Sequence, residues 1–459
     1  MEILRKLPRV RIGICALIFF SVLGCEKEQQ KTQVPPSSTG EEVLAATALL
    51  STLEGGEKPE GNGPSSGNNP SLVVVFNERG RGVAYVAQKE GLLHIVHNGK
   101  AGRLVAAVDQ MSISPDGKRI AYSSQIEGKW RMVIDDKVGV LSDEVNDPVF
   151  SPDSRHIAYQ ARTAEKWHMV VDDMMSPGRL SYLGKPQFSA DSTKVLYGEQ
   201  AGKGQKTRLI VSDLSLKNQY FKKNNVTHFI TNEDTTRVAA VIDENKKYKA
   251  MTFSFAAPAV VTQGPGYDSI SSPAFGADGI SLSYIAEKGG KRYLVLNGKE
   301  ELLPDGTVPG LPVVRPDNKG VGVIMTSKDG AFLHQGFFHD GIKEKQYDEV
   351  ADLVYSKDSS IHAYSARKGE SWFIVANGKE GPVFDRVVTP VFSPDNKLLV
   401  YRARKDGKRF VVVADAAGKV LGRHPSYEQV FQPVFTADGK SVAYGIKDGQ
   451  KLIWKVEKL

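Results

Sequence analysis

The feature that most constrains the fold is a short pattern that recurs about every 40 residues from Leu72 to the C-terminus. Each clear copy has a bulky apolar residue, Ser or Thr, Pro or Ala, then Asp, and ends six residues later on Tyr. The clear copies are Ile113–Tyr122, Phe150–Tyr159, Phe188–Tyr197, Phe392–Tyr401 and Phe435–Tyr444, and weaker ones end at Tyr85, Ala240, Tyr284, Val323 and Tyr364. Tandem units of this kind bury their apolar faces by stacking on one another, so the range 71–459 is predicted to be one repeat-built body.

Each unit also shows the signs of four short strands. Pairs such as Asn98-Gly99, Asp135-Asp136 and Asn377-Gly378 suit the positive φ angles of two-residue hairpin turns. An apolar run such as Met132-Val133-Ile134 precedes each pair, and a further short strand follows it. Alternating, β-branched runs between hairpin turns exclude a helical solenoid. Four-stranded units in tandem predict an all-β fold, a β-propeller.

The pattern Phe-Ser-Pro-Asp-Gly-x-x-Ile-Ala-Tyr resembles the WD40-like (PD40) repeats of TolB and of the prolyl oligopeptidase propeller, over roughly Leu72 to Leu459. This resemblance implies blades of the same kind. It does not imply the translocation role of TolB, because the α/β domain that precedes the TolB propeller has no counterpart here. Nor does it imply peptidase activity, because the repeats continue to Leu459.

The number of repeats leaves two arrangements open. About ten blades form either one large ring, which we favour, or two rings of about five. The first unit begins with its innermost strand at 73–76, whereas the last unit ends on its third strand, at 451–459. The final blade therefore lacks a fourth strand unless a segment upstream supplies it.

Residues 1–24 have the layout of a secretory signal peptide. Basic residues from Arg5 to Arg11 precede an apolar run, and the segment from Arg11 to Cys25 is too short for a transmembrane helix, which needs about 20 residues. Val22-Leu23-Gly24-Cys25 resembles the lipobox of bacterial lipoproteins, which implies cleavage before Cys25 and lipid attachment to its sulfur. The alternative is an ordinary secretory signal with an incidental cysteine. The other cysteine is Cys15, so residues 26–459 have no thiol for a disulfide or a metal.

The predicted location is therefore the cell envelope, where the lipid on Cys25 anchors the protein to a membrane. By resemblance to Gram-negative lipoproteins, Glu26 after the cysteine favours the outer membrane, with the protein facing the periplasm.

Residues 25–70 are predicted to be a disordered tether. Pro, Gly, Ser, Asn and Glu dominate this range, and such a composition buries too little apolar surface to offset chain entropy. One stretch, Glu41–Leu53, has apolar residues at helical spacing. Either it is a short helix that docks on the body, or it is a transient turn within the linker.

No catalytic, metal-binding or cofactor-binding residue is expected. Gly63-Pro64-Ser65-Ser66-Gly67 matches the nucleophile-elbow pattern, but Pro, Asn and Gly surround Ser65 where the elbow needs a strand and a helix. His94 and His97 are three apart on a strand and so point to opposite faces. The recurrent Asp is interpreted as a turn residue, and the Tyr and Trp columns as packing between blades. The Asp column comprises Asp116, Asp153, Asp191, Asp278, Asp317, Asp358, Asp395 and Asp438.

The predicted function is a membrane-anchored scaffold that binds a protein, glycan or other ligand on a propeller face without catalysis. The formal net charge is +7, of which residues 1–24 contribute almost half, too little to indicate a nucleic-acid partner. The alternative is a propeller-type enzyme, lactonase- or lyase-like, with catalytic groups gathered from several blades. A bound metal, or His and carboxylate groups clustered at the funnel mouth, would favour the enzyme.

Overall fold

The fold is described from a computed structural model of the whole chain. The described residues are 47–52, 58–59, 74–77, 79–200, 202, 206–329 and 332–459. Cys25 and Ser65 lie outside these ranges.

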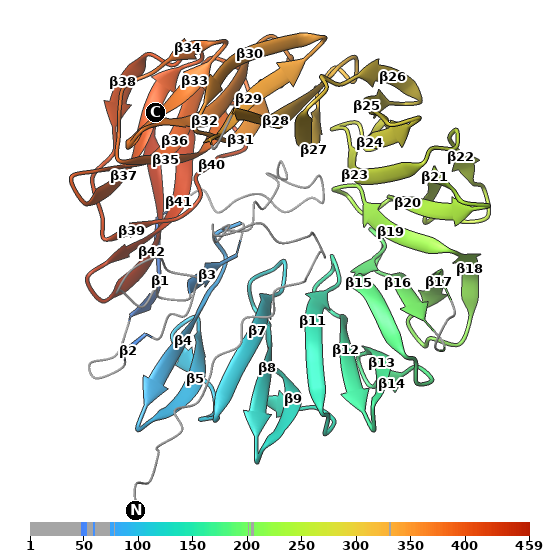
Figure 1. Cartoon of the computed structure of the whole chain (residues 1–459). Helices are drawn as coiled ribbons and strands as arrows, with labels where there is room; N and C mark the ends of the chain where they lie inside the picture. The colour runs from blue at the N-terminus through green and yellow to red at the C-terminus, as the bar shows by residue number, and fades with distance from the viewer. Residues whose placement is uncertain are drawn as a thin grey trace, which may run out of the picture.

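Within the described residues, the strands form ten antiparallel sheets, arranged as the blades of a single ring (Figure 1). In blades 2 to 9, the chain runs from an innermost first strand to an outermost fourth strand. The first strands of neighbouring blades contact one another from blade 2 to blade 7 and again between blades 8 and 9. The fold is thus the all-β propeller that the repeats predict, and ten blades share one ring rather than two.

In blade 1 two short strands, β2 (Lys58–Pro59) and β3 (Val74–Phe76), share the inner position beside β4 (Val83–Lys89), which pairs with β5 (Leu92–His97) and then β6 (Lys100–Ala101). Blades 2 to 5 comprise β7 (Ala107–Ile113), β8 (Ile120–Ile126), β9 (Lys129–Ile134) and β10 (Lys137–Val138); β11 (Glu144–Phe150), β12 (Ile157–Thr163), β13 (Lys166–Val171) and β14 (Met174–Met175); β15 (Ser181–Phe188), β16 (Lys194–Gln200), β17 (Arg208–Asp213) and β18 (Gln219–Asn224); and β19 (Val226–Thr231), β20 (Arg237–Glu244), β21 (Lys247–Ser254) and β22 (Thr262–Gln263).

Blades 6 to 9 comprise β23 (Ser269–Phe275), β24 (Leu282–Lys288), β25 (Lys291–Leu296) and β26 (Lys299–Leu302); β27 (Thr307–Val314), β28 (Val321–Asp329), β29 (Phe332–His339) and β30 (Ile342–Tyr347); β31 (Glu349–Tyr355), β32 (His362–Lys368), β33 (Ser371–Ala376) and β34 (Lys379–Glu380); and β35 (Arg386–Phe392), β36 (Leu398–Lys405), β37 (Lys408–Asp415) and β38 (Val420–Arg423). Blade 10 comprises β39 (Gln429–Val430) and β40 (Val434–Phe435), which both pair with β41 (Ser441–Asp448), then β42 (Lys451–Lys458) and, outermost, β1 (Ala48–Thr52).

The ring is closed by β1, which supplies the missing fourth strand of the last blade. It pairs antiparallel with β42, with Ala48 opposite Trp454 and Thr52 opposite Lys451. Figure 1 shows this blue N-terminal strand beside the red C-terminal one. Phe76 of blade 1 and Trp454 of blade 10 also contact each other, with their ring centroids 6.4 Å apart. One blade is therefore built from both ends of the propeller chain.

This closure corrects two expectations about residues 25–70. The stretch Glu41–Leu53 is not helical where the structure describes it, because Ala48–Thr52 is a strand. Leu49 is 56% exposed, whereas Leu50 packs against Val83 and Tyr85 of blade 1. In addition, β2 pairs with β4. The described parts of the range 25–70 therefore belong to the propeller and not to the tether that the composition predicts.

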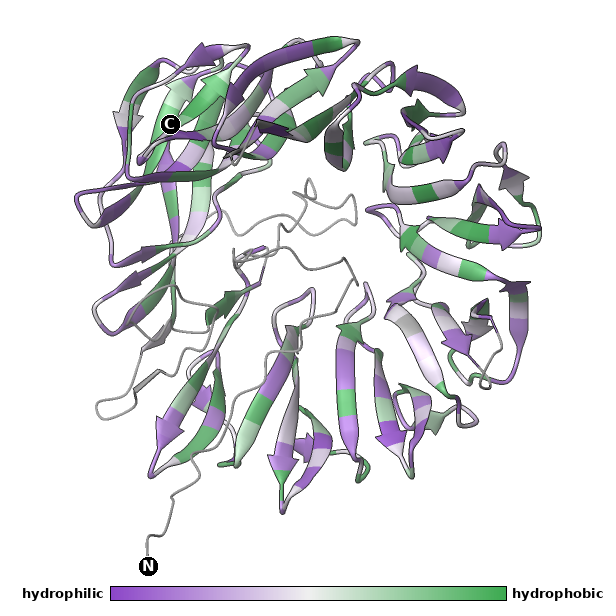
Figure 2. Ribbon diagram, in the orientation of Figure 1, coloured by the Kyte–Doolittle hydropathy of each residue, from purple (hydrophilic) through white to green (hydrophobic). Residues whose placement is uncertain are grey.

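The hydrophobic core lies between blades. Each cluster of buried side chains that spans two sheets joins neighbours, as where Trp372 and Ile374 of blade 8 pack with Leu399 and Tyr401 of blade 9. The Tyr column is buried as predicted, with 0–3% exposure at Tyr85, Tyr122, Tyr159, Tyr197, Tyr284, Tyr364, Tyr401 and Tyr444. Figure 2 shows hydrophobic stretches along the strands that form these faces.

The recurrent Asp has the turn role that the sequence predicts. In blade 2 the Ser114 hydroxyl donates to Asp116 at 2.6 Å, and the Lys118 N–H donates to the same carboxylate oxygen at 3.0 Å. The Asp116 N–H donates to Ser154 Oγ of the next blade at 3.0 Å. The Asp116 carboxylate thus stabilises its own turn, because short polar side chains satisfy backbone donors in turns. The bond to Ser154 also links this turn to the next blade.

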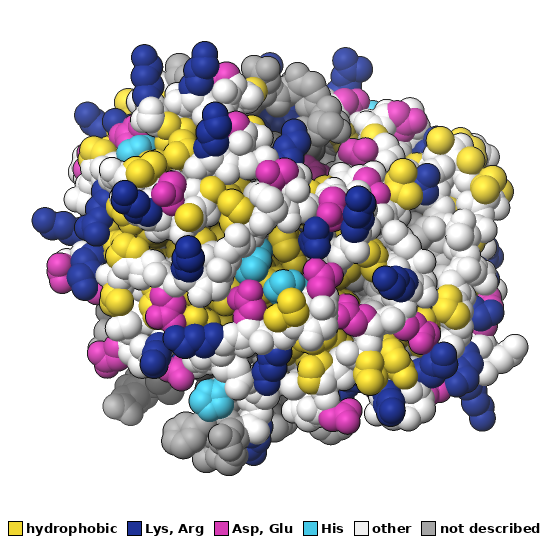
Figure 3. Space-filling view, turned by 90° about the horizontal axis from the view of Figure 1, so that it is seen from above, with side chains coloured by type: hydrophobic (Ala, Val, Ile, Leu, Met, Phe, Trp, Pro, Cys, Tyr) yellow, Lys and Arg dark blue, Asp and Glu magenta, His cyan; other side chains and the backbone are white. Residues whose placement is uncertain are grey.

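The described residues contain no helical segment with the length and hydrophobicity that a bilayer span requires. In the view of Figure 3, turned by 90° from that of Figure 1, basic and acidic side chains of the described residues are interspersed over the outer side of the ring. Among the described residues, no extended surface of a single charge sign, of the kind that nucleic acid binds, is visible on this side of the ring.

Candidate functional site

Among the described residues, one group of histidine and acidic side chains lies close enough together to hold a metal ion: His339, Glu344 and His362. We call it the His–Glu–His cluster. One ligand atom of each residue lies within 4.8 Å of the others. His362 Nε2 is 2.9 Å and His339 Nε2 is 3.4 Å from the same carboxylate oxygen, Glu344 Oε1. Both imidazoles therefore converge on one oxygen.

The cluster joins two blades. His339 ends β29 and Glu344 lies on β30, so both come from the outer hairpin of blade 7, whereas His362 begins β32, the second strand of blade 8. The side chains of His339, Glu344 and His362 are 19%, 15% and 12% exposed. The cluster is thus mostly buried in the seam between blades and does not lie on the innermost strands.

The repeats of the chain provide a reference for each of these positions. At the place of His362, two residues before the Tyr column, the other nine units all have an aliphatic residue: Val83, Ile120, Ile157, Val195, Val238, Leu282, Val321, Leu399 and Val442. Buried polar groups need partners, so a histidine here is unfavourable unless its surroundings change as well.

The surroundings do change. At the place of Glu344, blades 1, 2 and 5 have Gly102, Gly139 and Gly264, where an added Cβ would lie 3.2, 3.4 and 3.3 Å from the Tyr hydroxyl of the next blade. In blade 7 the position instead holds a carboxylate, and the Tyr364 hydroxyl donates to Glu344 Oε2 at 2.9 Å. The polar group therefore replaces the glycine at the interface that also holds the unusual histidine.

A second adaptation makes room for an aromatic ring against the cluster. A Cβ at Gly322 would lie only 2.4 Å from a ring carbon of Phe337, so a larger residue would displace that ring. The Phe337 ring stacks on His339 at 4.7 Å between centroids and also lies 4.7 Å from the His362 ring. Phe337 thus restricts the orientation of both imidazoles.

The electrostatics of the cluster favour a charged carboxylate. Burial raises the pKa of Glu344, but the two histidines and the Tyr364 hydroxyl outweigh burial and lower that pKa well below its usual value. The Glu344 carboxylate in turn raises the pKa of His339. On its other side, His339 Nδ1 lies 3.6 Å from Asp340 Oδ2, which also pairs with Arg315 at 3.1 Å.

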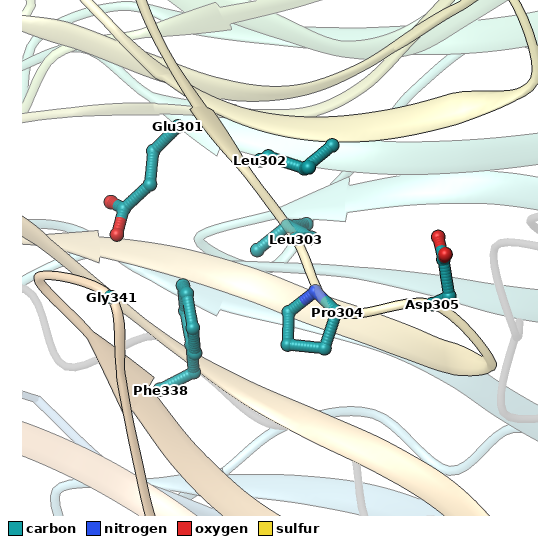
Figure 4. A pocket seen from close by; sticks show the side chains of 7 residues that line it. All are labelled: Glu301, Leu302, Leu303, Pro304, Asp305, Phe338 and Gly341. Carbon is teal, nitrogen blue, oxygen red and sulfur yellow. The ribbon is translucent and has the colours of Figure 1, made fainter.

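A pocket adjoins the hairpin on its opposite face, toward blade 6. Its volume is about 290 Å³, and Leu302, Leu303, Pro304 and Phe338 form its apolar lining, with Glu301, Asp305 and Gly341 at the margin (Figure 4). Phe338 and His339 are adjacent on β29 and therefore point to opposite faces of the blade. Leu302 is 51% exposed at the pocket.

The residues considered from the sequence lie elsewhere. His94 is buried at 2% exposure on β5, and its partner in the strand pairing is Ala87, whereas that of His97 is Ala84, so the two histidines point to opposite faces as predicted. The His–Glu–His cluster is not among the residues predicted from the sequence. A signal was present, since Ile361-His362-Ala363-Tyr364 interrupts an aliphatic column, but the proximity of Glu344 depends on the packing of two blades.

The fold defines this protein as a ten-bladed β-propeller. No protein-family model and no curated protein matches the sequence. Solved structures that resemble it include a eukaryotic initiation factor, with 14% identity, TM-score 0.45 and coverage of 76% of this chain and 96% of that one. The β-propeller domain of the Trilobed protease from Pyrococcus furiosus shares 11% identity, with TM-score 0.32 and coverage of 60% and 94%. An oligogalacturonate lyase in complex with manganese shares 16%, with TM-score 0.34 and coverage of 69% and 97%. These similarities concern the fold alone.

Proposed function

We propose that this protein is an envelope lipoprotein, anchored through lipid on Cys25, whose propeller binds a protein or glycan partner. The observation that carries the anchoring is Cys25 itself. It follows a basic segment and an apolar run, it ends a lipobox-like sequence, and residues 26–459 contain no other cysteine. Two acyl chains hold a protein on a bilayer where one does not, since each buried methylene contributes about 0.8 kcal/mol.

The closed ring supports a binding role for the propeller. Its loops emerge from strands that are held on both sides by neighbouring blades, and binding residues tend to lie on loops that a rigid scaffold positions. The strand β1, which follows the proposed anchor in the chain, lies on the outermost edge of blade 10.

The alternative function, a propeller-type enzyme, would gather its catalytic groups from several blades around the funnel. The His–Glu–His cluster comes from two blades and is mostly buried in their seam. This position fits a structural role better than contact with a substrate, so we propose binding rather than catalysis.

Cys25→Ser tests the anchoring. In wild type, radiolabelled palmitate should be incorporated and the protein should sediment with membranes. The variant should lose both the label and the membrane association. Cleavage after Gly24 together with retained palmitate in the variant would show that Cys25 is not the acylated residue.

Crosslinking in intact envelopes tests the binding role. Wild-type protein should yield a discrete crosslinked partner. Leu302→Asp tests whether the partner contacts the pocket between blades 6 and 7, because it changes an exposed residue there. Leu49→Asp, on the outer edge of blade 10, is its control. Absence of any specific crosslinked species with wild type, combined with turnover of an envelope glycan or lactone, would favour the enzyme.

A further inference from the structure

We propose that the His–Glu–His cluster is a binding site for a divalent transition-metal ion, with His339, Glu344 and His362 as its protein ligands. Two imidazoles and one carboxylate suit Zn²⁺ and related borderline cations, whereas Mg²⁺ and Ca²⁺ prefer all-oxygen sites. The ion would bridge blade 7, which supplies two ligands, and blade 8, which supplies the third.

The distances between the proposed ligand atoms fit one shared ion. Nitrogen and oxygen ligands bind Zn²⁺ at about 2.1 Å, so at bond angles of about 90° to 110° two ligands lie about 3.0–3.4 Å apart. The two imidazole nitrogens lie 2.9 and 3.4 Å from Glu344 Oε1. These separations are those that one shared ion would impose.

One of the proposed ligand atoms, His362 Nε2, lacks a hydrogen-bond partner among the described residues. His362 Nε2 is buried and, in the part of the chain that the structure describes, makes no hydrogen bond, although Glu344 Oε1 lies only 2.9 Å away. The two atoms are close, but their directions do not suit a hydrogen bond. A buried nitrogen without a hydrogen bond is costly, and a metal ion would satisfy it.

Neighbouring polar groups orient the side chains of two proposed ligands, His339 and Glu344. Metal-bound histidines usually have their second ring nitrogen directed to a carboxylate or carbonyl, and bound carboxylates are hydrogen-bonded in turn. Here His339 Nδ1 faces Asp340 Oδ2 at 3.6 Å, and Glu344 Oε2 accepts the Tyr364 hydroxyl at 2.9 Å. Two of the three proposed ligands, His339 and Glu344, are therefore oriented by neighbouring groups through their other polar atom.

Another blade interface shows what a His–Glu contact looks like without a third ligand. Between blades 9 and 10, His424 Nδ1 lies 2.7 Å from Glu457 Oε2, and the Tyr444 hydroxyl donates to that same oxygen at 2.9 Å. Burial lowers the pKa of His424. This interface has one histidine where blades 7 and 8 have two, so the second histidine is the feature that the proposal explains.

The test uses the purified full chain without a histidine tag, treated with EDTA and titrated with Zn²⁺ by calorimetry. Wild type should bind one equivalent. His362→Leu, which restores the residue found in blades 6 and 9, should fold and should weaken Zn²⁺ binding by about 100-fold or more, beyond the loss seen when supporting residues are changed. His339→Ala should do the same. The matched control is His97→Ala, because His97 occupies the position of His339 in blade 1, opposite Ala84 as His339 is opposite Gly322.

Thermal unfolding gives a second readout. Because a ligand of the native state stabilises it, Zn²⁺ should raise the Tm of wild type and of His97→Ala, but not that of His362→Leu. Wild-type protein without stoichiometric binding would overturn the proposal. Binding that survives at wild-type affinity in both His362→Leu and His339→Ala, or that is lost equally in His97→Ala, would also overturn it.

Discussion

At the scale of single residues, the same sequence position is buried to different extents in different blades. Trp372 is 4% exposed and packs with Phe384 and Val387, while the Arg386 guanidinium lies 3.9 Å from its ring centroid. Trp130, at the matching position in blade 2, is only partly buried. The expectation that the Trp column lies between blades is confirmed, but its members do not contribute equally.

Trp372→Ala should therefore lower the free energy of unfolding by about 3–5 kcal/mol, the usual range for a buried aromatic residue. Trp130→Ala should have a smaller effect, about 1–2 kcal/mol, because less of its surface is removed from water. Urea denaturation followed by circular dichroism measures both. A larger loss for Trp130→Ala than for Trp372→Ala would contradict this ranking.

The turn aspartates make the free energy of unfolding depend on pH in the acidic range. Hydrogen bonds from Ser393 and from the Lys397 N–H lower the pKa of Asp395, and the pKa values of Asp358 and Asp438 are lowered in the same way. A carboxyl with a lowered native pKa binds fewer protons in the folded state. Its contribution is fully present above the unfolded pKa of about 3.9 and is lost as pH falls through the native value.

The urea midpoint should hence decline below about pH 4, and less steeply in Asp395→Asn, which has no proton to take up. Ser393→Ala removes the donor and should raise the pKa of Asp395 in an NMR titration. If the variant and wild type lose stability with identical slopes between about pH 4 and pH 2, the turn carboxylate does not contribute to acid sensitivity.

The sequence was informative about residues wherever one position repeats. Asp116 and Tyr122 each have many equivalents in the chain, so their roles follow from recurrence. His362 is a single exception within a column, and its meaning depends on Glu344, which is distant in sequence and is brought close by the packing of blade 8 on blade 7. Exceptions of this kind are difficult to interpret before the neighbouring blade is known.

At the scale of elements, β1 shows how a short edge strand escapes prediction. Val43, Ala46, Leu49, Leu50 and Leu53 have helical spacing, but the pairing of Ala48–Thr52 with β42 determines the local structure. Leu49 is 56% exposed, whereas Leu50, at an irregularity in this pairing, packs against the buried cluster between blades 10 and 1. Tertiary pairing overrides a weak local preference here.

Leu50→Asp should detach β1, because the charged group would replace a leucine that packs against Val83 and Tyr85. We expect a loss of about 1–3 kcal/mol and faster hydrogen exchange at the β42 amides. The matched control is Leu49→Asp, on the exposed face, which should change stability by no more than about 0.5 kcal/mol. Equal exchange in the two variants would show that β1 is not held through Leu50.

At the scale of the whole molecule, the repeat count gave the blade number, and the incomplete last repeat indicated that a segment upstream completes it. The choice between one ring and two could not be made from the repeats, because every unit presents the same two faces to its neighbours. The contact of Phe76 with Trp454, and the strand β1 beside β42, join the ends into one ring.

A closed ring has no terminal blade, so the whole body should unfold as one cooperative unit. Removal of residues 1–52 leaves blade 10 without its outer strand and exposes the edge of β42. Among the described residues, contacts between faces would then still join blades 10 and 1, such as those within the buried cluster of Leu452, Val83 and Tyr85. In a urea series followed by hydrogen exchange and mass spectrometry, wild type should lose protection in all blades together. The truncated chain should lose it first in β41, β42 and β4, and only at higher urea in β20 and β21 of blade 5, opposite the closure. A single transition at the wild-type midpoint in the truncated chain would show that closure by β1 contributes nothing to the cooperativity of the ring.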